Sequence, residues 1–206
     1  EAFFKENDKA EVYMQDTSAE NCYFRTETGD KYIGIPVQLL EAYKERFHTL
    51  HTVCEVEKGV WAVPHSTENL DGMGRRAHMY RKVGDEFIAD DFAHEQSIVF
   101  ETEKGLVIFN SCSHGGIANI VREVQNAFAG KKIYAIIGGF HMMKLSGMDT
   151  LAIPEEEVVE TAQELKGLGV EEIYTGHCTG NIAFRILKKE LGEMVHALGT
   201  GETVVF

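Results

Sequence analysis

Three apolar runs constrain the fold of this chain most strongly, because each is followed by a turn that carries a histidine within two residues of a glycine. The runs cover residues 106–109, 133–137 and 172–175, and the histidines that follow them are His114, His141 and His177. Open α/β sheets place their ligands at the carboxyl ends of neighbouring strands. If these strands are neighbours, the three imidazoles converge on one rim, and convergent neutral imidazoles bind transition metals. The pattern therefore predicts an α/β fold with a metal site at one edge of a sheet.

The rest of the chain predicts strands and helices around this centre. Apolar residues at helical spacing follow His114 in 117–124, and Pro36 favours the start of another helix. Residues 51–56 and 59–63 are typical of a hairpin, and residues 97–102 lead through a tight turn into the central strand. We expect residues 16–35 to be irregular and residues 66–85 to be a functional loop or partly disordered. Residues 203–206 are a candidate edge strand.

Composition excludes several classes of function. The 206 residues suit one domain, and a net charge of −13 argues against nucleic acid or an anionic membrane as a partner. A small anionic substrate remains compatible, because a bound cation reverses the local field. No apolar run approaches the roughly 20 residues of a membrane span. The four cysteines are irregularly spaced and form no disulfide framework, so we expect a cytoplasmic protein.

Two cysteines lie next to the predicted rim. Cys112 precedes His114 by two residues, and Cys178 follows His177 directly. One interpretation is a structural zinc site made by both cysteines and both histidines. The other, which we favour, is that they are small buried thiols beneath the rim. Each histidine taken alone could equally be an ordinary loop residue, and only their common position favours a metal site.

Charged side chains supply further candidates for catalysis, metal ligation and substrate binding. Asp91 and Glu95 belong to an acidic group, with Asp90, that could act as general base or ligate a metal, or could simply be a solvated loop. Arg75, Arg76 and Lys144 could hold an anionic group such as phosphate, or could be solvated surface charges.

Four motifs taken in order resemble a known family. They are D-D-F-x-x-E-Q at 90–96, G-L-V-I-F-N-S-C-S-H-G-G-I at 105–117, I-G-G-F-H-M at 137–142 and G-H-C-T-G at 176–180. Together they resemble the metallo-β-lactamase-fold hydrolases, in the subgroup labelled 7,8-dihydropterin-6-methyl-4-(ribofuranosyl)aminobenzene 5′-phosphate synthase-like. The resemblance implies an αββα sandwich with one or two divalent ions, zinc first and manganese or iron as alternatives. It implies that His114 and His177 are metal ligands, and that His141 is a further ligand or a proton donor to the leaving group.

The chain departs from the family at its first metal motif, because H-x-H-x-D-H is absent. In similar chains that motif lies just upstream of a segment like residues 1–15. We therefore expect residues 1–206 to be a single metallo-β-lactamase-like domain that lacks its first strands, with residues 66–89 as a loop insertion near the site. The bridging aspartate of the superfamily has no clear match, and the histidines or Glu95 could replace it.

These observations predict a metal-dependent hydrolase that acts on a phosphoester or a similar small anionic metabolite through a metal-activated water. The alternatives are a non-catalytic binding or scaffold protein of the same fold, and a structural-zinc or thiol protein. Expected partners are a small anionic substrate, a second copy of the chain, or a chain that supplies the missing N-terminal segment.

Overall fold

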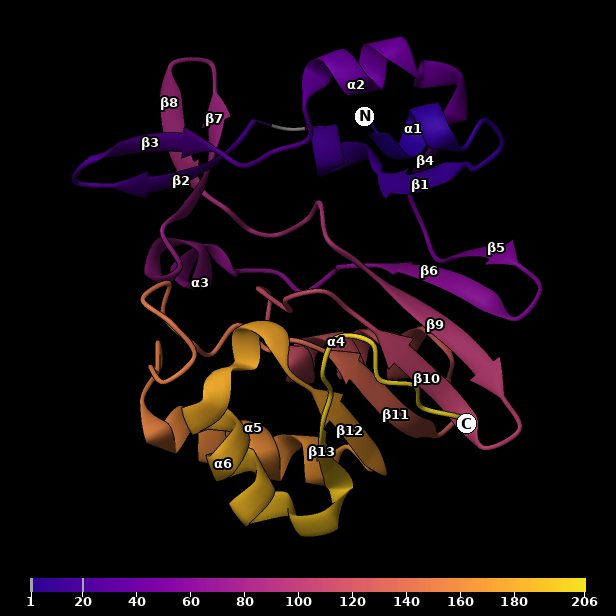
Figure 1. Cartoon of the computed structure of the whole chain (residues 1–206), viewed down its shortest axis with the longest axis vertical. Coiled ribbons are helices and arrows are strands. Elements are labelled where there is room, and N and C mark those ends of the chain that lie inside the picture. Colours follow the sequence, from indigo (N-terminus) through magenta and orange to yellow (C-terminus); the bar gives the residue numbers. More distant parts are fainter. Residues whose placement is uncertain (1, 20) are drawn as a thin grey trace.

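The structure is a computed structural model that describes residues 2–19 and 21–206; Glu1, and Glu20 from the segment 16–35, lie outside them. Its centre is a seven-stranded sheet with the order β13-β12-β11-β10-β9-β6-β5 (Figure 1). The strands are β5 (Cys54–Glu57), β6 (Val60–Pro64), β9 (Gln96–Thr102), β10 (Gly105–Phe109), β11 (Ile133–Gly138), β12 (Glu172–Thr175) and β13 (Val195–Ala197).

The strands that precede the three histidines are neighbours, as the sequence predicted. β10, β11 and β12 pair in parallel, with Phe109 opposite Ile137 and Gly138 opposite Thr175. Their carboxyl ends therefore meet at the same edge of the sheet. β5, β6 and β9 continue the sheet in antiparallel fashion, and β5 and β6 form the predicted hairpin.

Three helices cover one face of this sheet and close the main core. They are α4 (Ile117–Ala127), α5 (Glu155–Gly167) and α6 (Gly180–Leu191). Strand residues alternate between the two faces, so Ile108, Ile136 and Ile173 point toward the helices and are fully buried. Burying each such side chain contributes roughly 1.5–3 kcal/mol. This face therefore carries most of the stability of the fold.

The other face carries a smaller apolar cluster of Val107, Ala135 and Ile137. The end of the chain crosses this cluster, and the Phe206 ring lies 5.8 Å from Tyr134 and 5.7 Å from the Tyr174 ring, centroid to centroid. The expected edge strand at 203–206 is wrong, because those residues form no strand and β13 is the edge. The tail is held by aromatic contacts with the face of the sheet and not by pairing at its edge.

A second layer lies above the large sheet in Figure 1 and contains two smaller sheets. One pairs β1 with β4, and the other has the order β3-β2-β7-β8. The helix predicted at Pro36 begins at Val37. The elements are α1 (Ala2–Glu6), β1 (Val12–Gln15), β2 (Cys22–Thr26), β3 (Gly29–Tyr32), α2 (Val37–Ala42), β4 (Phe47–Leu50), α3 (Asp71–Arg76), β7 (Met79–Val83) and β8 (Glu86–Ala89), with short 3-10 turns at Asp16–Ala19, Lys44–Arg46, His177–Thr179 and Gly192–Met194.

The expectation of irregular structure at 16–35 and the alternative of partial disorder at 66–85 are wrong, because both segments contain helices or strands. The other alternative for 66–85, a functional segment near the site, stays a prediction. Residues 16–35 contain the hairpin β2–β3, and residues 66–85 contain α3, β7 and the turn into β8. The two hairpins are joined by the pairing of β2 with β7 and by the Tyr23 ring, which lies 5.3 Å from the Phe87 ring. Within its own hairpin, the Tyr23 ring lies 5.4 Å from the Tyr32 ring. The pairing and the Tyr23–Phe87 contact join residues far apart in the chain, which a local pattern does not reveal.

One aromatic contact marks the junction of the sheet with α4. Trp61, on β6, is the only tryptophan of the chain, and its ring packs edge-on against Phe128 with the centroids 5.4 Å apart. Among the described residues, no helix combines the length and the apolar character that crossing a membrane requires.

Candidate metal centre

The three predicted histidines gather at the carboxyl rim of the large sheet. His114 lies in the turn between β10 and α4, His141 follows β11, and His177 begins the 3-10 turn after β12. The ring centroids of His114 and His141 are 4.5 Å apart. His177 Nδ1 lies 3.7 Å from Cys112 Sγ, which belongs to the same turn as His114. The structure therefore brings His114 beside His141 and His177 beside Cys112 at one rim. Among the described residues, the rim group whose ligand atoms all lie within 4.8 Å of one another contains His177 but not His114 or His141.

The backbone at this rim is strained. Ser113, His141 and His177 have φ angles of 54°, 48° and 50°, in the left-handed region that non-glycine residues rarely adopt. Each such residue costs on the order of 1–3 kcal/mol and persists only where its surroundings hold it. Residues of this kind cluster at functional sites, so the strain is a second sign of function that is independent of residue type.

Two glycines let the strand ends approach one another. A Cβ on Gly138, whose φ is 153°, would lie 2.2 Å from the Asn110 carbonyl oxygen. A Cβ on Gly139 would lie 2.5 Å from Cys178 Sγ. Neither position has room for a side chain, and this close packing is what draws the turns after β10 and β12 together.

Glu95 and Phe92 position the His114 ring. The Glu95 carboxylate accepts a hydrogen bond from His114 Nδ1, and the ring stacks on Phe92 at 5.5 Å between centroids. Burial by itself lowers the pKa of His114, but hydrogen bonds to Cys112 and Glu95 outweigh it and raise that pKa to about 9. A carboxylate on one ring nitrogen is the usual outer partner of a histidine whose other nitrogen binds a metal.

The pKa of His141 is shifted in the opposite direction to that of His114. Burial and the neighbouring charge of His114 lower the pKa of His141 to about 4, so its ring is neutral at pH 7. A neutral imidazole has a free lone pair, which is the form that binds metals or accepts protons.

The cysteines complete the donor set. Cys112 Sγ, His177 Nδ1 or Nε2 and Cys178 Sγ all lie within 4.8 Å of one another. Hydrogen bonds from Cys178 and His114 lower the pKa of Cys112, whereas the hydrogen bond to Cys112 and burial raise the pKa of Cys178. Thiolate and imidazole donors in this number fit zinc, so the residues present suit the metal that the fold family implies.

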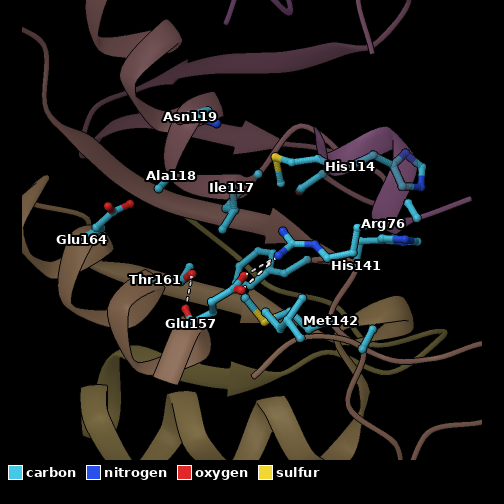
Figure 2. A pocket seen from close by; sticks show the side chains of 17 residues that line it. Arg76, His114, Ile117, Ala118, Asn119, His141, Met142, Glu157, Thr161 and Glu164 are labelled. Carbon is cyan, nitrogen blue, oxygen red and sulfur yellow. Dashed lines mark hydrogen bonds and ion pairs between the residues drawn. The ribbon is translucent and has the colours of Figure 1, made fainter. Parts of the chain in front are cut away.

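A cavity of about 210 Å³ opens beside His114 and His141. Its walls are largely apolar, with Ile117, Phe140 and Met142 among them. Figure 2 shows the Arg76 guanidinium joined to the Glu157 carboxylate, and its Nη1 lies 3.0 and 2.9 Å from the two oxygens. The cavity thus offers apolar surface and an ion pair next to the histidines.

The structure separates other predicted residues from this cavity. Arg75 pairs with Asp71 at 2.5 Å and Asp91 pairs with Arg81 at 2.8 Å, and both Arg75 and Asp91 line a different, shallow pocket. Lys144 is exposed and is not among the residues that line the histidine cavity. Of the predicted acidic and basic candidates, Glu95 and Arg76 lie at the histidines.

Sequence reasoning missed a buried pair that supports the rim. Glu123 Oε1 accepts hydrogen bonds from His65 Nδ1 (2.6 Å), from the Ser66 and Thr67 amides (2.9 and 2.8 Å) and from the Thr67 hydroxyl (2.6 Å). Burial raises the pKa of Glu123, but these donors outweigh it and lower the pKa. A Cβ on Gly115, beside His114, would lie only 1.6 Å from His65 Nε2. The available signal was that Glu123 follows Ile120 by three residues, on the buried side of α4.

Comparisons with known proteins agree with this picture. No family model matches the sequence. Over 128 residues the chain is 34% identical to a 7,8-dihydropterin-6-methyl-4-(β-D-ribofuranosyl)-aminobenzene-5′-phosphate synthase of Methanocaldococcus jannaschii. That match covers 62% of this chain and 41% of the relative, so the chain spans less than half of the relative's length.

A solved structure confirms the fold. The crystal structure of a metal-dependent hydrolase of the β-lactamase superfamily superposes with a TM-score of 0.78, covering 97% of this chain and 73% of the other, at 24% identity. At that identity the likeness shows the fold alone. The α/β metallo-β-lactamase fold and the resemblance predicted from the four motifs are therefore confirmed.

Proposed function

We propose that this chain, which has the metallo-β-lactamase fold, is a metal-dependent hydrolase of a phosphoester or a similar small anionic metabolite. The observation that carries the proposal is the position of His114 and His141, 4.5 Å apart between ring centroids, at the same rim as the group Cys112, His177 and Cys178. His114 and His141 also line a cavity of about 210 Å³. Three imidazoles from separate strand ends have no common structural purpose, because the core beneath them is already closed by α4, α5 and α6.

His114 and His177 would hold a divalent ion, with zinc as the first choice and Cys112 and Cys178 as neighbouring donors. When bound, the ion would lower the pKa of a water and polarise the scissile bond. Glu95 keeps the His114 ring in one orientation, so that its second nitrogen is presented in a fixed direction. His141 borders both the cluster and the cavity, and its ring is placed to complete the donor set or to exchange a proton with the bound substrate.

The cavity supports a substrate that combines an anionic group with a flat apolar part. Arg76 is the basic side chain of this lining, which also contains Glu157 and Glu164. Because Arg76 is paired with Glu157, an anionic group would have to share or replace that ion pair. Ile117, Phe140 and Met142 supply the apolar surface. The name of the Methanocaldococcus relative describes a product with a phosphate and aromatic groups, which likewise combines an anionic group with apolar surface.

A second candidate function is a synthase reaction like that of this relative. The 34% identity favours it, whereas the chemistry of the rim favours hydrolysis. The two are separated by products: hydrolysis consumes water and one substrate, and synthesis joins two.

The direct test measures bound metal and phosphodiesterase activity on bis(p-nitrophenyl) phosphate. We expect His114→Ala and His177→Ala to lower both, with activity falling by about a hundredfold or more, since loss of an outer partner alone costs 10–100-fold. His51→Ala is the matched control, because His51 is exposed and paired with Asp16 on the other layer. The proposal is wrong if both rim variants keep the metal content and activity of the parent protein. Metal binding without turnover of any phosphoester would favour the non-catalytic binding protein instead.

We also propose a reducing compartment, and hence the cytoplasm. All four cysteines are free thiols in the structure, including the close pair Cys112 and Cys178. Disulfides are rare in the cytoplasm, where thiols are kept reduced.

A further inference from the structure

A second group of metal-binding side chains lies away from the rim. Cys22 lies on β2, and Asp90 and His94 lie on the segment between β8 and β9. The Cys22 sulfur, an Asp90 carboxylate oxygen and a His94 ring nitrogen lie within 4.8 Å of one another. Three potential ligands from two distant parts of the chain therefore converge on one point.

This group is buried and already ordered. Cys22 and Asp90 are 5% and 1% exposed, and the His94 side chain is 24% exposed. His94 Nε2 lies 3.1 Å from Asp90 Oδ2, while Asp90 Oδ1 accepts a 2.9 Å hydrogen bond from the Phe92 amide. One carboxylate oxygen is thus fixed by the backbone and the other faces the imidazole, which is how ligating carboxylates are usually held.

We propose that Cys22, Asp90 and His94 form a second zinc site, separate from the rim, that ties the four-stranded sheet to the large sheet. Sulfur, imidazole and carboxylate are the three ligand types that zinc accepts. His94 also borders a cavity of about 210 Å³ behind the rim, from which a water can complete a tetrahedral shell.

The surrounding charges are compatible with a cation. A Cys22 thiolate and the Asp90 carboxylate balance the two charges of zinc. Besides the His94 ring itself, Asp90 is paired with Arg81, whose Nε lies 3.8 Å from Asp90 Oδ1, the oxygen turned away from His94. A second nitrogen of Arg81 lies 2.8 Å from Asp91 Oδ2, so Asp91 offsets the guanidinium charge.

The position of this site gives it a purpose. Glu95, which orients His114, directly follows His94 in the chain. A metal on Asp90 and His94 would hold this segment against β2 and so keep Glu95 in place beneath the rim. The site is therefore structural, and it can be filled whether or not the rim catalyses hydrolysis.

The first experiment counts zinc. The protein is loaded with zinc, desalted and measured for zinc equivalents, as the parent chain and as Cys22→Ser, His94→Gln and the control Cys54→Ser. Cys54 is a free cysteine on β5, outside both clusters. We expect Cys22→Ser and His94→Gln each to lose one equivalent and Cys54→Ser to lose none. Equal zinc content in the parent chain and in Cys22→Ser would overturn the proposal.

Zinc bound at the rim must be distinguished from zinc bound by Cys22, Asp90 and His94. Cobalt replaces zinc in the Cys112→Ser, Cys178→Ser background, which removes the rim thiols. A thiolate-to-cobalt charge-transfer band should persist there and vanish when Cys22→Ser is added. Absence of the band from the Cys112→Ser, Cys178→Ser protein would contradict the second site, whatever the rim variants do to activity.

A measurement on the unmodified chain guards against variants that fail to fold. Alkylation of Cys22, mapped by mass spectrometry, should accelerate at least tenfold when a chelator removes zinc, because metal-bound thiolates are masked. Cys54 in the same sample should react at the same rate with and without chelator. Equal rates for Cys22 under the two conditions would show that no metal covers it.

Discussion

The middle and the carboxyl ends of strands β10, β11 and β12 differ in burial and in backbone conformation. In the middle, Ile108, Ile136 and Ile173 are fully buried, and the backbone is regular. At the ends, His141 and His177 sit in left-handed conformations among polar and charged neighbours. The buried middle of each strand therefore stabilises the fold, and the strained backbone at its carboxyl end offsets part of that stabilisation.

This contrast predicts that substitutions in the two regions change different quantities. A core substitution should lower stability and leave metal binding intact, whereas a rim substitution should remove metal binding at little cost in stability.

The largest expected loss of stability is at the core. Leu165→Ala, on α5, empties a fully buried position beneath the sheet and should cost about 2–5 kcal/mol. Urea unfolding of the metal-free protein measures the loss, and zinc content under native conditions should stay at the parent value. Loss of zinc from Leu165→Ala without a drop in its free energy of unfolding would contradict this difference between core and rim.

An intermediate effect is expected where the two regions meet. Gly138→Ala places a Cβ 2.2 Å from the Asn110 carbonyl oxygen in a conformation that favours glycine. The strand end must shift, so this variant should lose about 1–3 kcal/mol of stability and should also bind metal more weakly. Gly130→Ala is a control for the left-handed φ alone, since its Cβ would meet nothing within 4 Å. If the two variants behave alike, close packing at the rim is not the cause.

A smaller effect of opposite sign is expected at His177. His177→Gly relieves a φ of 50° at an exposed residue, so the metal-free protein should gain about 1 kcal/mol of stability while it loses metal. Thermal unfolding with and without zinc shows both changes. A destabilised metal-free variant would mean that the rim is not strained.

The smallest effect is the pH dependence of the Glu123 contacts. The folded-state pKa of Glu123 lies below its ordinary value of 4.5, so its contribution is present above that value and is lost as the pH falls through the folded pKa. Between about pH 7 and pH 3 the parent protein should therefore lose more stability than Glu123→Gln. Parallel urea midpoints for the two proteins across that range would contradict this assignment.

The large sheet and the meeting of the histidines could be predicted because apolar runs and glycine turns are local signals. The small hairpins could not, since Tyr23 is held by Tyr32 and by Phe87, and the Phe87 contact spans more than sixty residues of chain. At the site, two residues adjacent in sequence line different pockets: Arg76 lines the histidine cavity, whereas Arg75 lines another pocket. Which of two adjacent side chains on a short helix faces a site depends on how α3 is docked, which no sequence pattern encodes.

The single tryptophan gives the molecule a built-in optical probe. Trp61 touches Phe128 where β6 meets the end of α4, so its emission reports on that one junction. Opening of the core should shift the emission toward longer wavelengths, whereas rearrangement of the histidine turns should leave it nearly silent. Unlabelled protein can therefore reveal by fluorescence whether a variant has lost its scaffold or only the arrangement of its histidine turns.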